Sequence, residues 1–92
     1  MAYQAAQLHG PPNVALQYEQ ESLRLFVAFC RELQRAAGDK PFFLAGRSAA
    51  DVTNESHPQV ARWLRLLVMD KVLDLAKEGT RHHASEYRYR GD

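Results

Sequence analysis

The spacing of the apolar residues changes once along the chain, near residue 70, and this change limits the folds that are open to it. Before that point, apolar side chains recur every three or four residues, as Val60, Leu64 and Leu67 do, which is typical of one helix face. After it, apolar and polar residues alternate over 72–77 and again over 85–90, which predicts two half-buried strands. We therefore predict an α+β domain, mostly α, in which helices precede a C-terminal β-hairpin.

Three helices are predicted ahead of the hairpin, over 14–37, 46–53 and 57–70. The last two form a closely spaced pair, because Asn54 tolerates the left-handed conformation of a tight turn and Ser56 is a strong helix N-cap. A helix, a turn of about three residues and a second helix make a helix-turn-helix. The apolar run at 41–45 predicts a short strand or an extended entry into this pair.

The first predicted helix is apolar on two sides. Its main stripe contains Phe26 and Cys30, and a second strip is formed by Leu25 and Phe29, four residues apart. A helix of this kind is either well buried or shared with a partner. Two alternatives follow: the strip packs on a partner, or residues 14–18 fold back and cover it.

The ends of the chain and its composition set further limits. The sequence His-Gly-Pro-Pro-Asn ends the first 13 residues, so we expect 1–13 to be a flexible lead-in or linker and 14–92 to be the domain. A single cysteine, Cys30, excludes an intrachain disulfide and fits a reducing cytoplasm. No apolar run approaches the roughly 20 residues that span a bilayer, and the start of the chain lacks the pattern of a signal peptide. We expect a cytoplasmic protein that makes no contact with membranes.

Enzyme chemistry has no recognisable signature in this sequence. There is no glycine-rich phosphate loop, nucleophile elbow or paired-carboxylate motif. His82 and His83 are adjacent, and no cysteine or acidic pair with metal-ligand spacing lies near them. We therefore expect a binding protein rather than an enzyme, with no cofactor, metal or small-molecule substrate.

The order of helix, short strand, helix-turn-helix and hairpin is that of a winged helix-turn-helix domain, with a three-helix core and a hairpin wing. Residues 41–91 also resemble the winged helix domains of phage- and plasmid-type replication proteins, which often accompany primase-polymerase or helicase modules. The resemblance rests on "FFL", "R-x-A-A", "SHP", "A-R-W-L-R-L-L", "V-L-x-L", "K-x-G-T", "A-S" and "Y-R-Y". Three residues depart from the pattern: Asn54 and Lys71 stand where glycine is usual, and Glu55 stands where an apolar residue usually packs.

In a winged helix domain, the second helix of the pair enters the major groove of DNA. Glutamine can pair with adenine and arginine with guanine, so the polar face of 57–70 supplies the expected base contacts. The basic hairpin tip at 78–84 would lie on the DNA backbone or in the minor groove. Side chains expected to contact DNA are Arg47, Ser56, His57, Gln59, Arg62, Arg65, Arg81, His82, His83 and Arg88. For each of them the alternative is a solvated surface, and for Arg88 it is pairing with Asp74 across the hairpin.

Two classes of function remain open at this stage. The first is binding of double-stranded DNA, within a replication protein or a small transcriptional regulator. The second is a winged helix that forms a homodimer or docks on a larger replication protein, through Leu25, Phe29, Leu66 and Met69. The net charge of +1, from 12 basic and 11 acidic residues, favours neither class.

Overall fold

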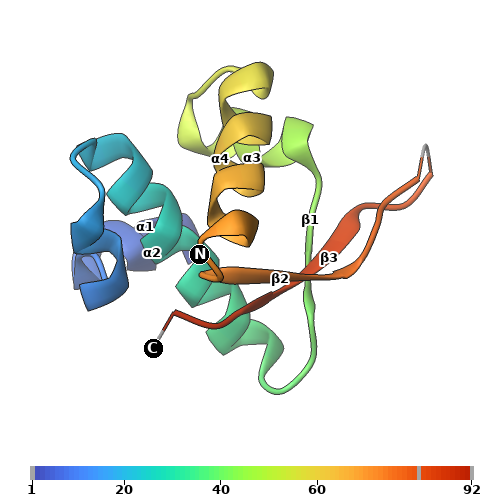
Figure 1. Ribbon diagram of the computed structural model, residues 1–92, viewed down its shortest axis with the longest axis horizontal. Coiled ribbons are helices and arrows are strands. Elements are labelled where there is room, and N and C mark those ends of the chain that lie inside the picture. Colours follow the sequence, from blue (N-terminus) through green and yellow to red (C-terminus); the bar gives the residue numbers. More distant parts are fainter. Residues whose placement is uncertain (1, 81, 92) are drawn as a thin grey trace.

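Helices occupy the first two-thirds of the chain and a hairpin ends it, as Figure 1 shows for the computed structural model, which describes residues 2–80 and 82–91. The elements are α1 (Ala2–His9), the 3-10 helix η1 (Asn13–Gln17), α2 (Glu21–Ala37), β1 (Phe42–Leu44), α3 (Gly46–Thr53), α4 (His57–Met69), β2 (Leu73–Lys77) and β3 (Ser85–Tyr89). All strand pairs are antiparallel, and the sheet order is β1-β3-β2. The prediction of an α+β domain that is mostly α is confirmed.

The core lies where α2 and α4 meet each other and the sheet. Phe26 of α2 packs on Trp63 of α4, with ring centroids 5.4 Å apart, and Leu67, Leu73 and Val60 are fully buried. The apolar stripe of α4 therefore packs as its spacing predicted, and Trp63 is a core residue rather than an exposed aromatic platform.

The connection between α3 and α4 follows the sequence prediction closely. Asn54 ends α3 in the left-handed region, with φ 57° and ψ 37°. The Ser56 side chain then accepts a hydrogen bond from the backbone N–H of Gln59 at 3.2 Å and caps α4, with Pro58 in the first turn. Lys71 also adopts a positive φ of 62°, directly after α4. This conformation is unfavourable for a residue that has a Cβ atom.

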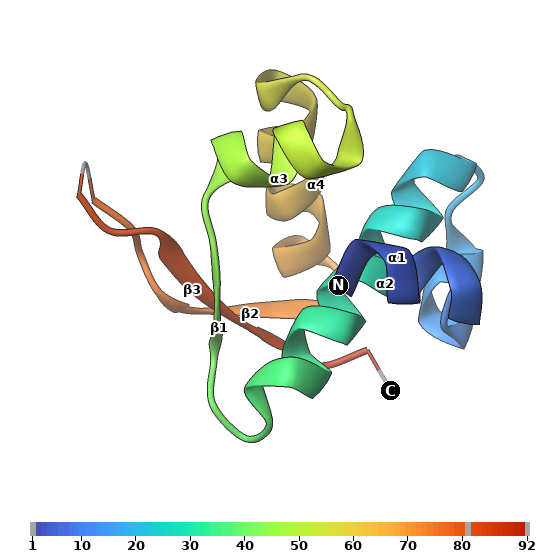
Figure 2. The same cartoon turned by 180° about the vertical axis from the view of Figure 1, so that it is seen from behind.

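The prediction of a flexible lead-in over 1–13 is wrong, because α1 packs along α2 (Figure 2). Ala6 is fully buried, and the Tyr3 ring meets Phe29 edge to face with centroids 5.8 Å apart. The Gly10-Pro11-Pro12 segment was expected to break structure over all of 1–13, but it only ends α1 after His9.

The single helix predicted over 14–37 is also wrong, because η1 and α2 are separate. The chain is extended at Tyr18 and at Gln20, which precede α2. Arg24 Nε donates a hydrogen bond to the Tyr18 carbonyl oxygen at 2.5 Å, which satisfies a backbone group in this break.

Of the four residues expected to form a protein interface, three are buried or partly buried in the structure. Phe29 is 5% exposed beneath Tyr3, so the prediction that it offers a free surface is wrong. Helix α1 covers Phe29, and η1, which includes residues 14–17, also packs on α2. Leu25 and Leu66 are partly buried against the core, and only Met69 is exposed, at 78%.

The hairpin β2–β3 reaches away from the helices (Figure 1). Its register pairs Asp74 with Arg88 and Leu75 with Tyr87, and then shifts at a bulge before Lys77. Because the strands extend beyond the core, Leu75 is 45% exposed while Leu73 is buried. None of the helices formed by the described residues has the length and apolar character that crossing a membrane requires.

Candidate nucleic-acid interface

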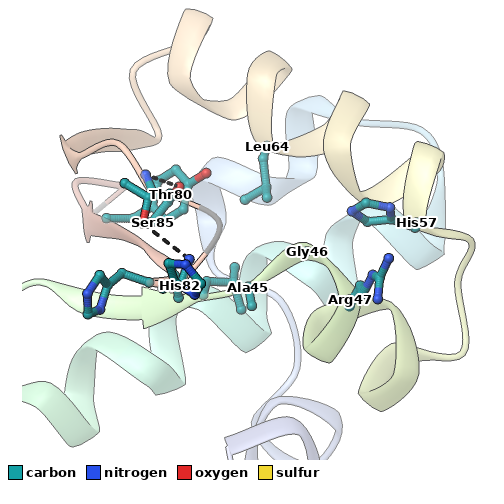
Figure 3. Close-up of a pocket in the computed structure, with 13 residues that line it drawn as sticks. Ala45, Gly46, Arg47, His57, Leu64, Thr80, His82 and Ser85 are labelled. Carbon is teal, nitrogen blue, oxygen red and sulfur yellow. Dashed lines mark hydrogen bonds between the residues drawn. The ribbon is translucent and has the colours of Figure 1, made fainter.

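A groove of about 500 Å³ lies between the first turns of α3 and α4 and the loop that joins β2 to β3 (Figure 3). It is lined by Leu44, Ala45, Gly46, Arg47, His57, Leu64, Gly79, Thr80, His82, His83, Ala84, Ser85 and Tyr87. Arg47 and His57 lie at one end in Figure 3, and His82 lies at the other with Thr80 and Ser85. This lining contains four cationic or protonatable side chains and no carboxylate, so the groove suits an anion. We call it the basic groove.

The start of α4 turns His57 into the basic groove. A Cβ atom placed on Gly46 would lie 2.8 Å from His57 Nε2, closer than real contacts allow. The imidazole can therefore rest against the first turn of α3 only because residue 46 has no side chain. His57, expected to contact bases in the major groove, faces the basic groove instead.

The hairpin loop is held in shape by its own hydrogen bonds. The Gly79 N–H donates to Ser85 Oγ at 2.9 Å, and the Thr80 N–H donates to the His83 carbonyl oxygen at 2.9 Å. The His82 N–H donates to Thr80 Oγ1 at 3.3 Å. This bonding keeps His82 and His83 at the rim of the basic groove, where both are exposed. Arg81, which was expected to contact DNA beside them, lies outside the described residues.

The outer face of α4 presents two arginines and no acid. Arg62 and Arg65 are exposed, and α4 contains no aspartate or glutamate. Arg62 Nη2 donates to Gln59 Oε1 at 3.0 Å, so two of the expected base-reading side chains are joined. Arg65 makes no hydrogen bond or ion pair to the part of the chain that the structure describes. The Arg65 guanidinium is therefore available to an anion, and Arg62 keeps the N–H groups that do not bond to Gln59.

Arg88 is not brought to this surface. Its Nη1 donates to the carbonyl oxygen of Asp39 at 2.7 Å, in the turn between α2 and β1. The predicted alternative was that Arg88 pairs with Asp74 across the hairpin. Asp74 pairs with Arg90 instead, whose Nε lies 2.5 Å from Asp74 Oδ2. Arg88 is therefore removed from the expected DNA contacts.

Sequence reasoning missed an apolar groove beside the outer face of α4. Its volume is about 460 Å³, and it is lined by Ala61, Leu64, Arg65, Val68, Met69, Leu75 and Tyr87. Leu75 could have indicated this groove. It was assigned to the buried face of a strand, but the strand extends beyond the core and leaves Leu75 45% exposed. Gly46, Thr80 and Ser85 were also missed; they shape the basic groove but carry no charge to mark them.

The described side chains do not provide what a metal site or a reactive cysteine requires. Among residues 2–80 and 82–91, no three His, Cys, Asp or Glu side chains are grouped so that they could hold a metal ion. Burial raises the pKa of the Cys30 thiol far above its ordinary value, which makes it unreactive. Comparison of the chain with protein-family models, curated proteins and solved structures gives no match. The case for a function therefore rests on the geometry of the basic groove and of α4.

Proposed function

We propose that this chain is a winged helix-turn-helix domain that binds duplex DNA, as a module of a DNA replication protein. Helix α4 is the recognition helix in the major groove, and the hairpin loop 78–84 is the wing on the backbone or in the minor groove. The order α2, β1, α3, α4, β2, β3 and the sheet order β1-β3-β2 support the fold assignment. The replication role has its support in the resemblance of residues 41–91 to the winged helix domains of replication proteins.

The observation that carries the proposal is the set of exposed cations, unpaired among the described residues, on α3, α4 and the hairpin loop. Arg62 and Arg65 on α4, Arg47 on α3 and the histidines of the hairpin loop are exposed, and none forms an ion pair with the described residues. DNA affinity depends mainly on such groups, because each cation placed on a phosphate releases a condensed counterion. The helix itself has a suitable size: its 13 residues span about 20 Å at about 1.5 Å per residue, and a major groove admits one helix.

A salt titration tests the proposal directly. Fluorescence anisotropy of a labelled mixed-sequence duplex should give affinities that fall steeply with salt, consistent with about 4–7 phosphate contacts. Arg65→Ala should lower the magnitude of the log–log salt slope by about 1 if Arg65 contacts a phosphate. The matched control is Lys40→Ala, which removes one exposed positive charge in the turn between α2 and β1, away from the start of α4 (Figure 1). We expect this control to leave the slope unchanged.

Base reading needs a selected sequence. With a duplex selected from a random pool, Arg62→Ala should weaken binding by about 1–3 kcal/mol if Arg62 reads a base. The same variant should lose less on the mixed-sequence duplex. No binding to any duplex at low salt would overturn the proposal.

The apolar groove supports a second candidate function, which is protein association. Met69 is 78% exposed and Leu75 is 45% exposed at this groove, and exposed apolar surface of this kind marks interaction sites. A homodimer through this groove, or docking on a larger replication protein, would depend little on salt. Light scattering at high protein concentration tests the homodimer, because a monomer at every concentration excludes it.

A further inference from the structure

We infer that the basic groove holds one backbone phosphate of the bound duplex and that His57 is protonated in that complex, so that DNA binding strengthens as pH falls. The inference rests on the proposed function and assigns to His57 a role other than base reading. It starts from the position of the imidazole, which lies against Gly46 at the start of α3 and faces into the groove (Figure 3).

The groups that face His57 all favour a negatively charged ligand. Helix α3 contributes Arg47, and the hairpin loop contributes His82 and His83. Helix α3 also begins here without a side-chain cap, at Ala45, so its first N–H groups add donors to the same space. No acid among the described residues lines the groove. If His57 is protonated, the negative charge that balances it must therefore come from a bound anion.

The nearby acids do not line the basic groove. Glu55 lines a separate small cavity with Tyr3 and Phe26, and neither Asp51 nor Glu78 lines the basic groove. Among the described residues, His57 forms no ion pair with a carboxylate, so the counter-charge for a protonated imidazole comes from the bound phosphate. This links proton uptake to DNA binding.

The size of the effect follows from the number of protons taken up on binding. Histidine is the side chain that commonly changes its charge between about pH 5 and 8. A binding step that takes up one proton strengthens by up to about tenfold for each pH unit over which that proton is taken up. His82 and His83 also lie at the groove rim, so part of the dependence on pH comes from them.

Two variants remove the proposed role of His57 in different ways. His57→Gln keeps a polar side chain but cannot be charged. Gly46→Ala keeps the histidine but places a Cβ atom 2.8 Å from its Nε2, so the ring must shift from its place against α3. The contact is with a side chain on an exposed residue rather than with backbone, so we expect the fold to survive. The matched control is His9→Gln, which changes an exposed histidine on α1 in the same way.

The experiment measures duplex affinity of the full chain at about pH 6 and about pH 8, at constant ionic strength. For the unmodified chain we expect affinity to be at least about tenfold higher at the lower pH. His57→Gln should reduce this ratio to about threefold or less, Gly46→Ala should reduce it by a smaller amount, and His9→Gln should leave it unchanged.

The possible failures are distinct. Absence of duplex binding at both pH values overturns the proposed function, and this inference with it. Duplex binding whose pH ratio is the same with and without His57→Gln overturns the inference alone.

Discussion

Replacing Tyr3 by alanine should destabilise the whole domain, because α1 is part of the fold. The Tyr3 ring lies edge to face on Phe29, with centroids 5.8 Å apart and ring planes at 82°. Phe29 is 5% exposed and also contacts Phe26. Removing the Tyr3 ring therefore opens a route for water to the aromatic side of α2.

The expected loss follows from the burial and the ring geometry. Truncation of a fully buried aromatic residue costs about 3–5 kcal/mol, and an edge-to-face pair contributes about 0.5–1.5 kcal/mol beyond its buried area. Tyr3 is only partly buried against the core, so we expect a loss of about 1.5–2.5 kcal/mol in the free energy of unfolding. In a domain of this size each kcal/mol lowers Tm by about 4–8 °C, so Tm should fall by about 10 °C.

Thermal and urea unfolding followed by circular dichroism would measure this loss. The matched control is Leu8→Ala on the same helix, where the side chain is 82% exposed and the change in helix propensity is worth only a few tenths of a kcal/mol. If Tyr3→Ala and Leu8→Ala both stay within about 0.5 kcal/mol of the unmodified chain, α1 does not contribute to stability and the argument from packing is refuted.

Three further predictions concern local conformation and the core. Lys71→Gly should raise the free energy of unfolding by about 0.5–1 kcal/mol, because Lys71 has a positive φ of 62° that costs a residue with a Cβ atom more than it costs glycine; a loss of stability in urea unfolding would contradict this. Ser56→Ala should cost about 1 kcal/mol by the same measurement, because the Gln59 N–H loses its partner, and an unchanged midpoint would show that the cap is not used. Burial raises the pKa of the Cys30 thiol, so the thiol stays neutral in the folded chain at pH values where it ionises in the unfolded chain. The free energy of unfolding should therefore be unaffected by this thiol below about pH 8.5 and should fall as pH rises above that value. The thiol should accordingly react with a disulfide reagent only on unfolding, and fast reaction of the folded chain would place it at the surface.

The elements that the sequence predicted are those with local signals. Residues 46–53 form α3 with the predicted bounds, and α4 ends within one residue of its prediction. Asn54 and Ser56 mark this region because their backbone preferences do not depend on distant contacts. The strands were visible for the same reason, since alternation is a property of a few adjacent residues.

What the sequence did not predict depends on contacts between distant segments. Helix α1 has eight residues, too few to be stable alone, and it forms because Tyr3 and Ala6 pack on α2. The break before α2 is bridged by Arg24, which binds a carbonyl oxygen six residues earlier. Neither contact leaves a periodic pattern.

The candidate site shows the same division. Arg62 and Arg65 were predicted to face outward, and they do, because a helix fixes which side each residue takes. The direction of His57 depends on Gly46, eleven positions earlier, and that of Arg88 depends on the Asp39 carbonyl, 49 positions earlier. Contacts between residues this far apart in the sequence depend on the three-dimensional fold, so local sequence patterns do not predict them.

A net charge of +1 conceals how the acids and bases are distributed. Several acids are engaged away from the proposed DNA-binding surface: Glu32 is buried against Arg31 and Arg35 under α1, Asp74 pairs with Arg90, and Asp70 accepts a hydrogen bond from Tyr18 at 2.7 Å. Among the described residues, no carboxylate forms an ion pair with Arg47, Arg62, Arg65, His82 or His83. Counterion release depends on the cations that meet phosphates, not on the net charge of the chain. A nearly neutral domain can therefore bind DNA with a strong salt dependence when its unpaired cations, rather than its carboxylates, meet the phosphates.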